Sequence, residues 1–162
     1  MAKDITIRLH VSEIVYDVRN KTWLAGRSAL NGNNHEQVAH MQASDDEEDE
    51  NQMTRSIINA MSVLKTAVGE YVMPDSQDQS ANVLDKHATY DFVLKMPNNY
   101  NESLRETLSA AMHQYVVDIC VRDWYMLTNK EDAQAYDNMA TSQLGIIEKA
   151  LTRRVRPTYT AP

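Results

Sequence analysis

Six consecutive acidic residues, Asp45 to Glu50, are the densest group of ionisable side chains in the sequence, within the segment SDDEEDENQMTRSIINAM (44–61). Carboxylates can hold cations, but calcium-binding loops space their ligands at alternate positions around a required glycine, and this run contains no glycine. His35 and His40 lie nearby, but their five-residue spacing differs from the i, i+4 histidine pair of helical zinc sites. The acidic run therefore does not predict a metal site.

A helix start explains the same acidic run. Ser44 and Glu47 have the spacing of a capping box, in which each side chain accepts a hydrogen bond from the backbone N–H of the other residue. Acidic side chains in a first turn also interact favourably with the positive end of the helix dipole. Apolar residues then recur at i, i+3 and i+4 spacing: Met53, Ile57, Ala60, Met61, Leu64, Val68 and Tyr71. We therefore predict a charged, solvated start of an amphipathic helix rather than a mimic of nucleic acid, which would need acidic groups over a broad surface.

Motifs typical of catalytic sites are absent from the sequence. The sequence has no glycine-rich phosphate loop, no G-x-S-x-G elbow and no H-E-x-x-H pair. Two segments, 85–87 and 118–123, combine titratable groups, but such combinations are common by chance. Cys120 is the only cysteine, which excludes an internal disulfide framework, and its apolar neighbours predict a small buried side chain. We expect no enzymatic activity, no metal and no cofactor.

Length and charge narrow the class of protein further. A chain of 162 residues is about one domain long. The formal net charge is −7, and removing the six acidic residues of the run leaves −1, so the acidity is local. We therefore do not expect the body of the protein to bind free nucleic acid. Because we find neither a signal peptide nor an apolar run of about 20 residues, we expect a soluble protein made in a reducing compartment, with no membrane partner.

The elements that position these residues are mostly helices, since the chain has only four glycines and four prolines. Ser12 is the predicted cap of a helix that runs to about Leu24, with Gly26 as its stop. Residues 26–43 are polar and contain a strong Asn-Gly turn signal. We expect a surface loop there, with a helical turn around HEQVAHM.

Two further helices follow in the second half of the chain. The segment 104–127 has the longest apolar stripe, and we place it at the centre of the core. Ser103 and Glu106 repeat the capping-box spacing before it. The last helix starts at Thr128 or Asn129 and ends in a cationic group, which suits the negative pole of the helix dipole: Lys149, Arg153, Arg154 and Arg156.

Two segments alternate apolar and polar residues, DITIRLHV (4–11) and ATYDFVLKMP (88–97). We predict a strand or extended arm over 1–11, and a polar linker followed by a strand over 73–96. The second strand can pair with 5–11, or form a hairpin over 83–96 with a short strand near NVLDKH. Because an isolated two-stranded sheet is marginal, it must lie on the helices or pair with a neighbouring subunit, and we expect its companions on adjacent molecules.

The predicted fold is therefore mainly α, a bundle of three to four helices with a small β element. It forms a single domain over 1–157, followed by an unpatterned tail, 158–162. Eight tyrosines and two tryptophans against a single phenylalanine supply aromatic side chains with polar tips. Such side chains suit half-buried surfaces between subunits as well as cores.

The order of these parts resembles a known family. The helix containing SIINAMSVLKTAVGEYV, the strand YDFVLKMP, the segment NNYNESLRETLSAAMHQYVVDICVRDWYMLTNK and the closing LTRRVRP follow one another. This arrangement resembles the small head–tail connector proteins (adaptor, or head-completion, proteins) of tailed bacteriophages. It is also similar to proteins from phages and prophages of gut Bacteroidales. The resemblance covers roughly residues 44–157, and the longer N-terminal part, 1–43, departs from the usual small adaptor.

The resemblance implies a structural virion protein at the head–tail junction, made in the host bacterial cytoplasm. Its members form helical rings, commonly of twelve copies, docked beneath the portal protein and against other connector or tail proteins. DNA passes through the lumen of such a ring without sequence-specific binding, and the family has no catalytic residues.

Charge adds a candidate interface, since a ring of identical subunits needs one patch to contact a different patch on the next copy. We expect the acidic helix start to face the cationic end of a neighbouring chain. The candidate interface residues, together with one aromatic side chain of the tail, are Asp45, Asp46, Glu47, Glu48, Arg153, Arg154, Arg156 and Tyr159. The alternative is a small phage-encoded intracellular helical adaptor or regulator that binds a host or phage protein.

Overall fold

The computed structural model describes residues 2–73 and 88–159 of the chain. This part contains five α-helices and a two-stranded antiparallel sheet, which confirms the predicted fold class. The elements in chain order are β1 (Lys3–His10), α1 (Val11–Ser28), α2 (His35–Met41), α3 (Glu47–Ala67), β2 (Thr89–Met96), the 3₁₀ turn η1 (Glu102–Leu104), α4 (Arg105–Thr128) and α5 (Lys130–Thr152).

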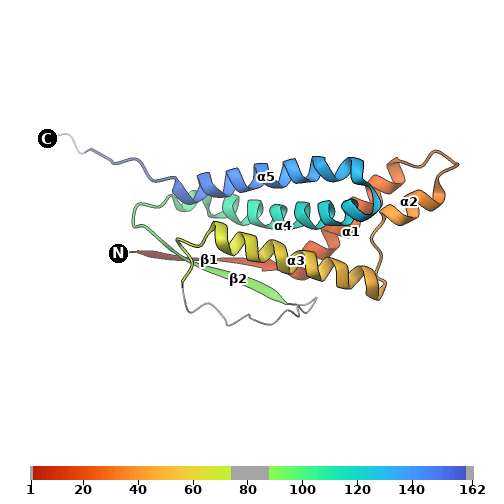
Figure 1. Cartoon of the computed structure of the whole chain (residues 1–162). Helices are drawn as coiled ribbons and strands as arrows, with labels where there is room; N and C mark the ends of the chain where they lie inside the picture. Colours follow the sequence, from red (N-terminus) through yellow and green to blue (C-terminus); the bar gives the residue numbers. More distant parts are fainter. Residues whose placement is uncertain (1, 74–87, 160–162) are drawn as a thin grey trace.

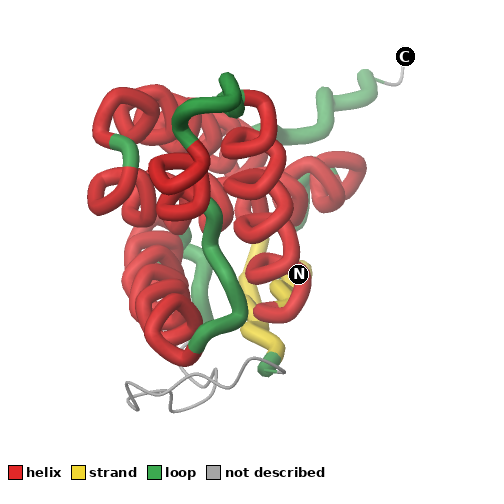
Figure 2. The backbone as a smooth tube through the Cα atoms, turned by 90° about the vertical axis from the view of Figure 1, so that its right-hand side faces the viewer, coloured by secondary structure: helices red, strands yellow, loops and turns green. Residues whose placement is uncertain are grey.

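The three long helices α3, α4 and α5 run side by side, and the sheet lies beneath them (Figure 1). The view along the bundle shows both strands on one side of the helices (Figure 2). α1 and α2 extend from one end of the bundle, and the C-terminal tail leaves from the opposite end (Figure 1). The molecule therefore has two ends that differ in structure.

α4 occupies the centre of the core, as predicted. Its buried side chains point in all directions around the helix, including Leu108, Met112, Val116 and Val121. A helix that is apolar all round must be covered on all sides. α5 packs along it after the single intervening residue Asn129, while α1, α3 and β1 cover the remaining sides.

β1 and β2 pair with each other within one chain. Ile5, Ile7 and Leu9 lie opposite Leu94, Phe92 and Tyr90, and these side chains face the helices. The prediction that the strands find their companions on adjacent molecules was therefore wrong for this pair. Of the two pairings considered, the one with 5–11 is confirmed, and NVLDKH lies outside the described residues. Burial of one face against the bundle stabilises a sheet that would be marginal alone.

Both ends of α1 differ from the prediction. α1 begins at Val11 and continues through Gly26 to Ser28. Gly26 is small for another reason, because a Cβ atom there would lie 2.9 Å from Cγ of Gln42. The residues 35–41 form α2, which confirms the helical turn predicted in the loop 26–43.

Both predicted capping boxes were wrong, since other side chains compete for the same groups. Ser44 bonds Asp49 rather than Glu47, and Asp46 precedes α3. Before α4, Oδ1 of Asn101 accepts hydrogen bonds from both N and Oγ of Ser103, at 3.2 and 2.6 Å. This contact places Ser103 in the turn η1 instead of a cap.

Candidate interaction surfaces at the two ends

The six acidic residues divide into two groups. Asp45, Asp46, Glu47 and Glu48 are exposed around the first turn of α3. Asp49 and Glu50 are half-buried and bind within the chain. The four exposed acidic residues are those that the sequence placed in the candidate interface, and we call them the acidic end.

Asp49 and Glu50 fasten the start of α3 to neighbouring segments. Oδ2 of Asp49 accepts from N and Oγ of Ser44 at 2.9 and 2.7 Å. Nη2 of Arg19 donates to Oε1 of Glu50 at 3.0 Å, and Nε of the same arginine donates to the Ser44 carbonyl at 3.1 Å. These contacts hold the acidic end in a fixed position relative to α1.

At the other end of the molecule, the cationic residues after α5 play different roles. Arg154 is half-buried, and its Nη1 donates to the Leu151 carbonyl at 2.7 Å, which caps the helix. Arg153 and Arg156 are exposed. Tyr159 is 91% exposed on the tail, which follows α5 without helix or strand. Arg153, Arg156 and Tyr159 therefore form the accessible part of this end.

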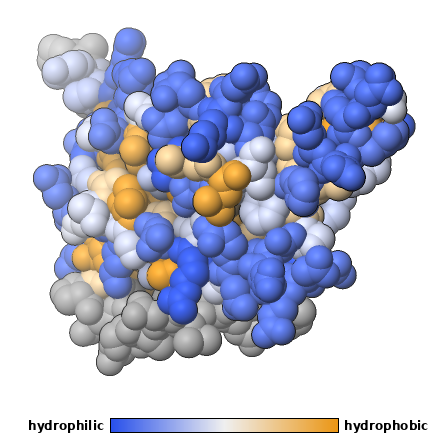
Figure 3. Space-filling view, turned by 45° about the vertical axis from the view of Figure 1, so that its right-hand side comes forward, coloured by the Kyte–Doolittle hydropathy of each residue, from blue (hydrophilic) through white to orange (hydrophobic). Residues whose placement is uncertain are grey.

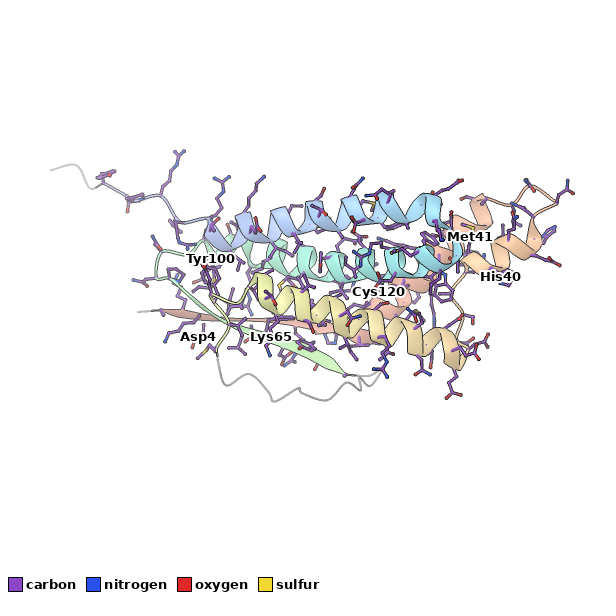
Figure 4. The ribbon with its side chains drawn as sticks, in the orientation of Figure 1. Asp4, His40, Met41, Lys65, Tyr100 and Cys120 are labelled. Atoms are coloured by element: carbon purple, nitrogen blue, oxygen red, sulfur yellow. The ribbon has the colours of Figure 1, made fainter. Side chains whose placement is uncertain are left out.

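Backbone contacts fix the direction in which the tail leaves. N of Val155 donates to the Asn99 carbonyl at 2.9 Å, and Tyr100 forms a β-bridge with Arg154. Figure 4 shows Tyr100 at the end of the bundle where the tail departs. From there the tail points away from the bundle (Figure 1).

The two sets of predicted interface residues lie at opposite ends of the molecule (Figure 1). α3 has 21 residues and so separates its acidic start from its other end by about 30 Å. The structure does not bring the acidic and cationic residues together within one chain. A contact between them requires two chains.

The sequence did not indicate a groove between the N-terminal segment and α4. It has a volume of about 520 Å³, and its lining includes Arg8, His10, Glu13, Glu106, Ser109 and His113. Nε2 of His113 lies 2.7 Å from Oδ2 of Asp17, so this histidine links α4 to α1. Packing of β1 and α1 against α4 brings these residues together, and no local spacing could have indicated it.

The titratable segment 118–123 contains a buried carboxylate, and the sequence did not predict its burial. Asp118 is fully buried, and its Oδ1 accepts from Nζ of Lys21 at 3.2 Å and from Nε2 of Gln114 at 2.8 Å. Among the described residues, its Oδ2 has no hydrogen-bond partner. Burial and the nearby charge of Asp118 raise the pKa of Tyr136 on α5. This cluster joins α1, α4 and α5, and its contacts are those of a packed interior.

α1 presents an aromatic stripe on the side opposite to the core. Tyr16 and Trp23 are 65% and 46% exposed, and the guanidinium of Arg27 lies 5.3 Å from the centre of the Trp23 ring. Figure 3 shows a mostly hydrophilic face with several separate apolar spots. Exposed tryptophan, tyrosine and arginine side chains are typical of protein-binding surfaces.

The sequence singled out Cys120, the acidic run and two titratable segments as residues that could carry chemistry. Cys120 is buried inside the bundle (Figure 4), and burial raises the pKa of its thiol. Within the described residues, 2–73 and 88–159, no group of three His, Cys, Asp or Glu side chains could hold a metal ion. The segment 85–87 lies outside the described residues. None of the described helices is both long and apolar enough to cross a membrane.

Comparison with known proteins gives no match to a family model, to a curated protein or to a solved structure.

Proposed function

We propose that this protein is a structural component of a tailed-bacteriophage virion, a head–tail connector protein that assembles into a ring between the portal and the tail. In this proposal DNA passes through the lumen of the ring without sequence-specific contacts. The observation that carries the proposal is the placement of the acidic end and the exposed tail arginines at opposite ends of the molecule.

Opposite ends of complementary charge favour a heterologous contact, in which one patch binds a different patch on the next copy. Contacts of this kind repeat from chain to chain and close into a ring when the rotation between neighbours allows it. The tail adds a further surface, since Tyr159 is almost fully exposed. The resemblance in the order of helices and strand supports the assignment to the connector, as does the mainly helical fold.

The aromatic stripe of α1 favours a second candidate function. A small intracellular adaptor or regulator would use Tyr16, Trp23 and Arg27 to bind one partner protein. Such a protein would be a monomer or dimer whose assembly state does not respond to a portal protein. Alanine at Tyr16 and Trp23 would then abolish its binding while leaving self-association unchanged.

Charge reversal tests the connector proposal. Arg153→Glu with Arg156→Glu should weaken self-association, measured by mass photometry or sedimentation velocity at micromolar concentration with and without a candidate portal protein. Arg154 is kept because it caps α5. Asp46→Lys with Glu48→Lys should weaken it equally.

The two reversed pairs provide their own control. Chains that carry both pairs of substitutions restore complementary charges between neighbours, so assembly should recover in the quadruple variant. Reversing Glu131 and Asp132, which are exposed acidic residues of the first turn of α5, serves as the matched control and should leave assembly unchanged. If the reversed arginines assemble as the original chain does, the charge contact is wrong.

A further inference from the structure

The outer edge of β1 has no neighbouring strand in the described part of the chain. The Val93 carbonyl on β2 accepts a hydrogen bond from N of Met73 at 3.0 Å, so the backbone of Val93 points away from β1. Its partner across the sheet is Thr6. Because residues opposite each other in an antiparallel pair share one hydrogen-bonding state, Thr6 is also a non-hydrogen-bonded position. Its N–H and C=O therefore point to the outer edge of β1. The pattern repeats every two residues, so the same holds for Asp4 and Arg8.

One side chain already uses this edge. Nη2 of Arg105 donates to the Thr6 carbonyl at 3.2 Å, which confirms the direction of that carbonyl. It also shows that the start of α4 lies beside the edge. Unpaired strand edges bind additional extended chains readily, because the backbone groups are already aligned.

The groove of about 520 Å³ lies at the C-terminal part of this edge, where Arg8, Leu9 and His10 of β1 face α4. On the α4 side it is lined by the small side chains of Ser109 and Ala110, which allow close approach of a backbone. Glu13 and Glu106 add two carboxylates, for which no ion pair is seen among the described residues. Arg8 of the same lining already forms an ion pair with Asp91, so the groove offers a strand edge on one side and the two carboxylates of Glu13 and Glu106 beside it.

We propose that residues 155–159 in the tail of a second copy of this chain add to the outer edge of β1 as a third strand. This inference rests on the proposed assembly and identifies the surfaces that join neighbouring chains. It assigns the tail to the groove, whereas the acidic end can bind Arg153 or another cationic group of the same neighbour.

The tail has the properties that this edge requires. Val155, Thr158 and Tyr159 are residue types that favour strands, and the segment contains no glycine. Pro157 lacks an N–H, which is acceptable in an added strand whose outer side faces solvent. Arg156 is the only charged residue of the segment, is exposed, and complements Glu13 and Glu106 of the groove.

The occupant belongs to a second copy because the tail of the same chain is directed away. The bond from N of Val155 to the Asn99 carbonyl and the bridge between Tyr100 and Arg154 fix the first residues of the tail. Beyond them the chain leaves the bundle (Figure 1). We therefore assign the groove to the tail of a neighbouring molecule.

Disulfide trapping tests the proposal. Full-length chains with Ser109→Cys are mixed with full-length chains with Thr158→Cys under mild oxidation, and the mixed dimer is quantified. Cys120 does not compete, because it is buried. The matched control replaces Ser62, an exposed serine of α3, with cysteine. We expect the groove position to give about tenfold more mixed dimer than the control, a difference in contact free energy of about 1.4 kcal/mol. Equal yields overturn the proposal.

A second variant tests the strand edge itself. Thr6→Pro removes the outward N–H while leaving the groups that bind β2, so it should reduce the mixed dimer about tenfold with the far-UV circular dichroism unchanged. An unchanged yield overturns strand addition. If Thr6→Pro unfolds the chain, Glu13→Gln with Glu106→Gln takes its place; it tests the charge complementarity between the tail and the groove, and an undiminished yield overturns that contact.

The outcome separates this inference from the proposed function. Rings that form with no trapping above the control overturn the tail-to-groove contact alone. Chains that neither assemble nor cross-link, with portal protein present, overturn both.

Discussion

Replacing Lys21 with methionine removes the cationic partner of a fully buried carboxylate. Nζ of Lys21 lies 3.2 Å from Oδ1 of Asp118, and the side chains are 30% and 0% exposed. Methionine keeps much of the length and the apolar contacts of the lysine stem but not its charge. The substitution therefore tests whether the pair is held together by charge or by packing.

The expected cost follows from the burial of Asp118. Removal of one partner from a buried ion pair destabilises a protein by about 3–5 kcal/mol, because the other charge stays buried without compensation. Lys21 is partly exposed and Gln114 continues to donate to Oδ1, so we expect about 2–4 kcal/mol. For a domain of this size, that lowers the thermal midpoint by roughly 5–15 °C.

The assay is urea and thermal unfolding followed by far-UV circular dichroism. The double variant Lys21→Met with Asp118→Asn removes both charges and should recover most of the loss, since a neutral amide costs less to bury. Lys3→Met is the matched control, because Lys3 pairs with Glu102 at the surface, and it should leave the midpoint unchanged.

Two results would refute this reasoning. Lys21→Met could leave the free energy of unfolding unchanged, which would mean that the carboxylate is solvated or neutral in the folded chain. The double variant could also be as unstable as the single one, which would mean that the lysine stem, rather than its charge, stabilises α1 against α4.

The remaining predictions concern acid stability, thiol reactivity and tryptophan packing. The hydrogen bonds from Arg8 lower the pKa of Asp91, so this pair stabilises the fold above the ordinary carboxyl pKa and the stabilisation is lost as pH falls through the lowered pKa. Arg8→Met should therefore lower the thermal midpoint at neutral pH and converge with the original chain in acid; a constant difference would contradict this. The thiol of Cys120 should react with a disulfide reagent only after unfolding, because burial raises its pKa, and immediate labelling of the folded chain would show that the site is open. Trp124→Ala should cost about 3–5 kcal/mol, since Trp124 is 8% exposed and its Nε1 donates to the Met41 carbonyl at 2.8 Å. Trp23→Ala should cost less than about 1 kcal/mol, and equal losses in denaturant unfolding would show that α1 is covered.

Periodicity in the sequence predicted helices and strands correctly where the spacing of apolar residues alone determines the buried face. The alternation of Ile5, Ile7 and Leu9 matches their burial in β1, and the apolar residues of 104–127 match the buried faces of α4. Caps were less predictable, because several polar side chains compete for the same backbone groups. Ser44 had both Glu47 and Asp49 within reach, and the structure selects Asp49.

Tertiary contacts decide which residues of the candidate surfaces are accessible, and the sequence alone does not show these contacts. The sequence identified the acidic run and the arginines, but only the fold shows that Glu50 binds Arg19 and that Arg154 caps α5. The groove beside β1 combines residues from β1, α1 and α4, so no motif within one segment could indicate it. Pairing of strands that are distant in sequence is likewise a property of the whole chain.

Electron microscopy of the purified chain together with a candidate portal protein tests the assignment to the connector most directly. We expect closed rings docked on the portal, with the acidic end of each chain beside the cationic end of the next. Monomers or dimers that do not bind the portal protein would contradict the connector proposal and favour the adaptor or regulator.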